Sequence, residues 1–103
     1  MIGYVMVGTN DLSKSITFYD ALLNLLDLKR VDTTEDYAGY ESKNNPENIE
    51  FYITKPVNGD KANYGNGTQI SFVTELKDVV EKFHKLGVEL GGKSEGAPGE
   101  RPE

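Results

Sequence analysis

The sequence predicts an α+β fold in which a strand–helix unit occurs twice. Residues 4–8 alternate like a short strand and lead through Asp11 into an amphipathic helix. Residues 69–73 alternate in the same way, and a second amphipathic helix opens at Glu75. The two units align at a nearly constant offset, with Asn10 as the one extra residue of the first unit. The first unit contributes Val5, Val7, Thr9, Leu12, Ile16 and Tyr19. In the same order, these match Ile70, Phe72, Thr74, Leu76, Val80 and Phe83 of the second unit. Self-similarity of this kind indicates an internal repeat.

The composition limits the class of protein. A chain of 103 residues forms one domain with a modest core, and its net charge of −6 argues against nucleic acid and anionic membranes as partners. The N-terminus has no basic region followed by a long apolar run, so we expect no signal peptide, and no apolar run approaches the roughly 20 residues that span a bilayer. Without cysteine, disulfides, thiolate metal sites and a cysteine nucleophile are excluded. We therefore expect a soluble cytoplasmic protein.

The first half contains one helix between strands. Asp11 is a good N-cap, and an apolar stripe predicts a helix that ends near Asp27. Three strands are expected after it, over residues 28–34, 37–42 and 49–54. In the last of these, Ile49, Phe51 and Ile53 alternate with polar side chains. One strand before the helix and three after it make a βαβββ module over residues 1–56.

The second half repeats only the beginning of this pattern. Residues 57–66 form a linking loop, and residues 67–103 form a partial second module with one strand and one helix. The helix ends either at Gly87 or, after Leu90, at Gly91 and Gly92. Residues 94–103 carry no apolar periodicity and predict no core strand, so the second module is incomplete relative to the first.

Several short motifs, in order, resemble the vicinal oxygen chelate superfamily, which includes glyoxalases, bleomycin-resistance proteins and extradiol dioxygenases. The residues that carry the resemblance are Gly8, Thr9, Asn10, Asp11, Leu12, Ser15, Phe18, Tyr19, Lys55, Pro56, Asn58, Gly59, Gly65, Asn66, Gly67, Phe83, His84, Gly91, Gly92 and the stretch 95–102. The resemblance implies paired βαβββ modules whose curved sheets enclose a ligand cavity, usually within a homodimer. It also implies a final hairpin after Glu103, and because an exposed sheet edge is costly, a missing tail is favoured over a naturally short second sheet.

By the same resemblance, the metal-ligand positions align with Tyr4, Tyr52 and Gln69. Zinc prefers imidazole, thiolate or carboxylate ligands, and the only histidine, His84, lies in the second predicted helix. A divalent metal is possible but disfavoured, and no cofactor or catalytic residue is assigned. The alternation places polar and aromatic side chains opposite the apolar strand faces, where they would suit a small organic ligand. The predicted ligand-binding residues are Tyr4, Met6, Glu50, Tyr52, Gln69 and Ser71.

Three functions follow from these observations. The first is a glyoxalase-like, bleomycin-resistance-like protein that binds a small molecule without a metal. The second is a metal-dependent lyase, isomerase or dioxygenase. The third is a diverged module whose polar sheet face serves dimerisation.

Overall fold

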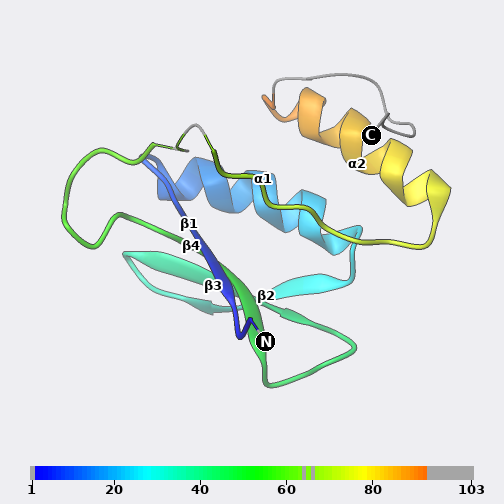
Figure 1. Cartoon of the computed structure of the whole chain (residues 1–103), viewed down its shortest axis with the longest axis horizontal. Coiled ribbons are helices and arrows are strands. Elements are labelled where there is room, and N and C mark those ends of the chain that lie inside the picture. The colour runs from blue at the N-terminus through cyan, green and yellow to red at the C-terminus, as the bar shows by residue number, and fades with distance from the viewer. Residues whose placement is uncertain (1, 64, 66, 93–103) are drawn as a thin grey trace.

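The computed structural model describes residues 2–63, 65 and 67–92, which form a two-layer α+β fold (Figure 1). A four-stranded sheet forms one layer, and both helices lie on the same side of it. The elements in chain order are β1 (Val5–Gly8), α1 (Leu12–Asn24), β2 (Leu28–Thr33), β3 (Tyr37–Ser42), β4 (Ile49–Thr54) and α2 (Lys77–Glu89). This arrangement confirms the predicted α+β class and the βαβββ order of the first half.

The sheet has the strand order β1-β4-β3-β2. β1 pairs with β4 in parallel, whereas β2 with β3 and β3 with β4 are antiparallel neighbours. The chain therefore crosses over through α1 before it returns to pair with its own first strand, as a parallel pair requires. The predicted ranges of β3 and β4 agree with the structure, and β2 ends one residue earlier than predicted.

α1 is anchored by a side-chain cap and by an apolar stripe. The Asp11 carboxylate accepts a hydrogen bond from the Lys14 amide at 3.1 Å, which confirms the predicted N-cap. The helix ends at Asn24, three residues before the predicted end, and Asp27 takes a positive φ of 61°. The core lies between this helix and the sheet and is formed by Leu22, Leu23, Ala38, Tyr40, Phe51 and Ile53.

α2 continues past Gly87 and ends in a Schellman motif. The amide of Gly92 donates to the Gly87 carbonyl at 2.7 Å, and that of Gly91 donates to Val88 at 3.1 Å. Gly91 has a φ of 106°, a conformation that side chains other than glycine rarely adopt. Of the two predicted helix ends, the structure confirms the later one. α2 packs on α1 where the Leu22 methyl groups approach Gly87.

The predicted strand over residues 69–73 is not formed. These residues are described, but they belong to no strand and form no backbone ladder with β1. Alternation in sequence reports which side chains prefer burial, but a strand also needs a neighbouring backbone to hydrogen-bond. Phe72 is nevertheless drawn inward as the alternation predicted, because its ring lies 5.5 Å from that of Phe51. Residues 94–103 lie outside the described part of the chain.

The alternation of β4 is interrupted by a bulge. Tyr40 pairs with Phe51, but Glu41 pairs with Ile49, so that Glu50 has no direct partner across the ladder. Ile49 consequently lies on the face of Gly39 rather than on the face of Phe51, where alternation had placed it. The prediction that Ile49, Phe51 and Ile53 share one face was wrong for Ile49.

In the ranges 2–63 and 67–92, neither helix is long and apolar enough to cross a bilayer.

Candidate functional site

Three tyrosines gather on the sheet face that the helices leave uncovered. The Tyr52 ring lies 5.1 Å from the Tyr4 ring and 5.9 Å from the Tyr37 ring, both between centroids and both edge-to-face. Each such edge-to-face pair contributes about 0.5–1.5 kcal/mol of stabilisation in addition to the contribution from the surface area that the rings bury. We call this surface, carrying Tyr4, Tyr37 and Tyr52, the tyrosine face.

One row of the ladder explains why the Tyr52 ring lies where it does. Met6, Tyr52, Gly39 and Asp32 are neighbours across β1, β4, β3 and β2, and paired residues share a face of the sheet. A Cβ atom on Gly39 would lie 3.0 Å from Tyr52 Cε1, so the ring occupies the space that the glycine leaves open. Tyr4 and Met6 are 57% and 47% exposed, so this apolar surface is open to a ligand.

The tyrosine face has one charged partner of its own. The Tyr37 hydroxyl donates to Asp32 Oδ2 at 3.2 Å. That hydrogen bond, together with the negative charge of the carboxylate, raises the pKa of the Tyr37 phenol. The hydrogen bond joins Tyr37 to Asp32, which lies in the same row as Tyr52.

The structure brings together half of the predicted ligand-binding residues. Tyr4, Met6 and Tyr52 meet on the tyrosine face, whereas Glu50 sits at the bulge of β4. Gln69 and Ser71 are exposed and bonded to each other, with the Gln69 amide donating to the Ser71 hydroxyl at 3.1 Å.

Gln69 and Ser71 lie apart from Tyr52 because of the segment that carries them. Phe72, which follows Ser71, packs on Phe51, and Phe51 points to the helix side of the sheet. The whole segment thus runs along the helix side, and Figure 1 shows it beside α1. Alternation in the sequence could not show that residues 69–73 form no ladder with β1.

The donor set does not fit a divalent metal ion. Of the positions that resemble metal ligands, Tyr4 and Tyr52 supply phenols, and Gln69 supplies an amide from the other side of the sheet. In the described part of the chain, no three His, Cys, Asp or Glu side chains cluster in a way that could hold a metal. Zinc sites require three or four such ligands together, and phenol with amide does not replace them.

A hollow lies largely on the other side of β1 from the tyrosine face, and sequence reasoning missed it. It has a volume of about 660 Å³ and lies between β1, α1 and the linking loop. We call it the β1 hollow; it is lined by Met6, Val7, Gly8, Thr9, Asn10, Tyr19, Ala62, Asn63, Gly65, Thr68 and Ile70.

One signal in the sequence pointed to the β1 hollow. Asn10 is the extra residue of the first repeat, and its side-chain amide bonds both backbone groups of Ala62. The insertion therefore attaches the linking loop to the start of α1. The sequence alone does not show this contact of Asn10, because the contact depends on where the linking loop lies in the fold.

Comparison with known proteins agrees with this fold. The family model described as the Glyoxalase/Bleomycin resistance protein/Dioxygenase superfamily matches residues 1–103. The crystal structure of a glyoxalase/bleomycin resistance protein from Albidiferax ferrireducens T118 is similar, with a TM-score of 0.83 and 38% sequence identity. The alignment covers 96% of this chain and 80% of that one. Among curated proteins, none matches. The chain belongs to the glyoxalase/bleomycin resistance protein/dioxygenase superfamily.

Proposed function

We propose that the protein binds a small organic molecule on the tyrosine face without a metal. The observation that carries this proposal is the position of Tyr52, flanked by the Tyr4 and Tyr37 rings on a face that no helix covers. Exposed aromatic surface of this kind gains free energy when a flat apolar ligand covers it. Membership of a superfamily named for glyoxalases, bleomycin resistance proteins and dioxygenases supports a small-molecule role.

Polar groups at the edge of this face would orient the ligand. Asp32 lies in the same row as Tyr52, and Glu41 follows two residues after Gly39 on the same face of β3, 4.0 Å from Lys29. An apolar platform with a few polar groups at its margin is the usual design of a small-molecule site. The phenol and amide donor set, which does not fit a divalent ion, supports binding through these side chains rather than through a metal.

A ligand screen by thermal shift tests the proposal. Aromatic compounds that bind the tyrosine face are expected to raise the Tm of the wild-type chain, and Tyr52→Leu is expected to abolish their shift because it removes the central ring. Phe18→Leu is the matched control, since Phe18 pairs with Tyr19 on α1 and lies away from the tyrosine face. If no compound in the screen loses its shift in Tyr52→Leu, or if the purified protein carries a stoichiometric divalent metal, the proposal is contradicted.

Sedimentation analysis separates ligand binding from a purely dimerising role. Exposed Tyr4 and Met6 would also suit contact with a second copy, in line with the expected homodimer. A Tyr4→Asp variant places a charge on this face. If the wild type is a dimer, Tyr4→Asp is a monomer and no compound shifts the wild-type Tm, the face serves dimerisation and the ligand proposal fails.

A further inference from the structure

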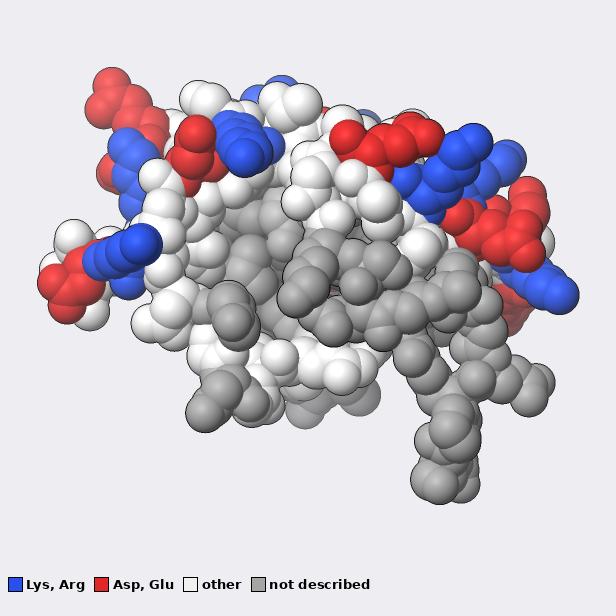
Figure 2. Space-filling view, turned by 90° about the horizontal axis from the view of Figure 1, so that it is seen from above, with Lys and Arg blue, Asp and Glu red and all other residues white. Residues whose placement is uncertain are grey.

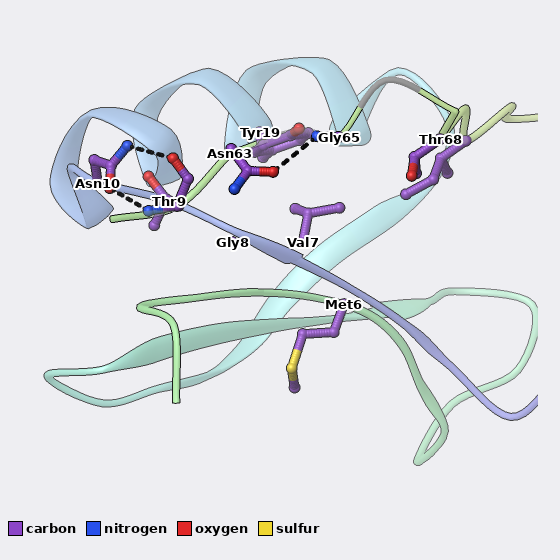
Figure 3. A pocket seen from close by; sticks show the side chains of 11 residues that line it. Met6, Val7, Gly8, Thr9, Asn10, Tyr19, Asn63, Gly65 and Thr68 are labelled. Atoms are coloured by element: carbon purple, nitrogen blue, oxygen red, sulfur yellow. Dashed lines mark hydrogen bonds between the residues drawn. The ribbon is translucent and has the colours of Figure 1, made fainter. Parts of the chain in front are cut away.

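We propose that the β1 hollow is a second ligand site, which takes an uncharged molecule with an amide-like hydrogen-bonding group on an aromatic or apolar body. It goes beyond the proposed function, because most of its lining lies on the opposite side of β1 from the tyrosine face; Met6 borders both. Figure 3 shows this geometry: Val7 points from the strand into the hollow, and Met6 points away on the far side.

Specific contacts hold the wall of the hollow in place. Asn10 Nδ2 donates to the Ala62 carbonyl at 3.0 Å, and Asn10 Oδ1 accepts from the Ala62 amide at 2.7 Å. A Cβ atom on Gly8 would lie 3.3 Å from Ala62 Cβ, so the loop sits closely against β1 at this point. Two hydrogen bonds and a close contact hold the loop at a fixed distance from the strand. The space beyond Ala62 is therefore preformed, as ligand sites usually are.

The size and lining suit a small organic molecule. About 660 Å³ lies within the range of roughly 300–1,000 Å³ that is common for such sites. Val7, Tyr19 and Ile70 supply an apolar and aromatic surface. The Tyr19 phenol carries no charge at neutral pH, because its ordinary pKa is 10.0 and burial raises it further.

The charge pattern selects against ions. The described lining contains no Lys, Arg, His, Asp or Glu side chain. Seen from the helix side in Figure 2, the described charged side chains gather toward the left and right ends of the face. A charged ligand would have no counter-charge in the described lining, whereas an uncharged ligand needs none.

The polar groups of the hollow favour a carbonyl or amide. The Oδ1 atom of Asn63 accepts from the Gly65 amide at 3.0 Å, and Figure 3 shows this side chain inside the hollow beside β1. With its oxygen engaged, Asn63 presents its Nδ2 donor to a ligand carbonyl, and the Thr68 hydroxyl can donate or accept. The Asn10 amide, by contrast, is committed to Ala62 at both atoms.

The proposal is tested by adding three small molecules of similar size to the ¹⁵N-labelled chain and measuring the changes in its amide NMR chemical shifts. Benzamide, benzoate and benzylammonium differ mainly in charge. We expect saturable shifts at Val7, Thr9 and Ala62 with benzamide and none at these residues with the two ions. Absence of saturable shifts with benzamide, or equal shifts with either ion, would overturn the proposal.

Variants then locate the binding. Asn63→Ala is expected to weaken benzamide binding about fivefold, the effect of one hydrogen bond, and Thr68→Trp is expected to fill the hollow and abolish binding. Asn58→Ala is the matched control, because Asn58 makes the same kind of turn, accepting from the Asp60 amide at 3.0 Å, outside the hollow. Binding that persists in Thr68→Trp, or that is unchanged in Asn63→Ala, would overturn the proposal.

The same experiment separates this site from the tyrosine face. Tyr52→Leu removes the centre of the tyrosine face and leaves the hollow lining intact. Benzamide shifts at Val7, Thr9 and Ala62 are therefore expected to remain in Tyr52→Leu. Their loss in that variant would show that the two surfaces are not separate sites and would overturn the proposal.

Discussion

At the scale of single residues, Tyr40 shows how a buried polar group is satisfied. Its side chain is fully buried, and its hydroxyl donates to Asp20 Oδ1 at 2.8 Å. Arg30 holds the same carboxylate, with its Nε atom 3.1 Å from Oδ1 and its Nη2 atom 3.1 Å from Oδ2. Three elements, β3, α1 and β2, thus meet at one carboxylate. A buried hydroxyl without such a partner would cost about 1–3 kcal/mol.

This arrangement predicts a loss of stability in alkali that depends on Tyr40. Burial, and then the hydrogen bond and charge of Asp20, raise the Tyr40 pKa well above its ordinary value of 10.0. The stabilisation is complete below pH 10.0 and decreases above it, because the unfolded chain ionises first while the folded chain keeps the proton. One such group contributes a decrease of about 1.4 kcal/mol per pH unit.

Urea unfolding between about pH 9 and about pH 11 measures this slope. Tyr40→Phe is expected to be less stable at the lower pH but to lose less free energy of unfolding as the pH rises. Tyr4→Phe, which removes an exposed phenol, serves as control and is expected to follow the wild type. Parallel pH profiles for Tyr40→Phe and the wild type would contradict the role given to Tyr40.

At the scale of elements, the pairing of β3 with β4 positions the tyrosine face. Gly39 faces Tyr52 across the ladder, and the bulge at Glu50 turns Ile49 toward the same glycine. The two side chains share the space above Gly39, where a Cβ atom would lie 3.0 Å from Tyr52 and 3.1 Å from Ile49. Because Gly39 has no side chain, the Tyr52 ring can occupy this space at the centre of the proposed ligand site.

Gly39→Ala is expected to destabilise the fold by about 1–3 kcal/mol, the usual cost of forcing an extra methyl into a packed site. It is also expected to displace the Tyr52 ring and weaken any ligand of the tyrosine face. Chemical denaturation and the thermal shift screen measure the two effects. Gly3→Ala is the control, because a Cβ atom there meets nothing within 4 Å. Equal stability of the two variants would show that the Tyr52 ring is not held by Gly39.

Elements with a local signal were predicted from the sequence, and those that depend on a distant partner were not. The Asp11 cap and the strand from Tyr37 to Ser42 each follow from residues adjacent in the chain, whereas the sequence left two possible ends for α2, of which the structure has the later. The bulge at Glu50 depends on how β4 meets β3, so alternation alone misplaced Ile49. Residues 69–73 have strand-like alternation but lack a ladder among the described residues.

At the scale of the whole molecule, the two sides of the sheet carry different surfaces. The helix side holds the core and the β1 hollow, and the other side holds the tyrosine face. Alternation predicted this division of apolar and aromatic surface, and it correctly grouped Tyr4, Met6 and Tyr52. It could not assign Gln69 and Ser71, because their position depends on the path of a segment that no strand pairing fixes.

The most direct test is a crystal structure of the chain grown with the compound that gives the largest thermal shift among those whose shift is lost in Tyr52→Leu. The account predicts ligand density against the Tyr52 ring, bordered by Tyr4 and Tyr37, with no metal peak between the ligand and the phenols. An ordered divalent ion bound to Tyr4 and Tyr52, or a ligand located away from the tyrosine face, would contradict it.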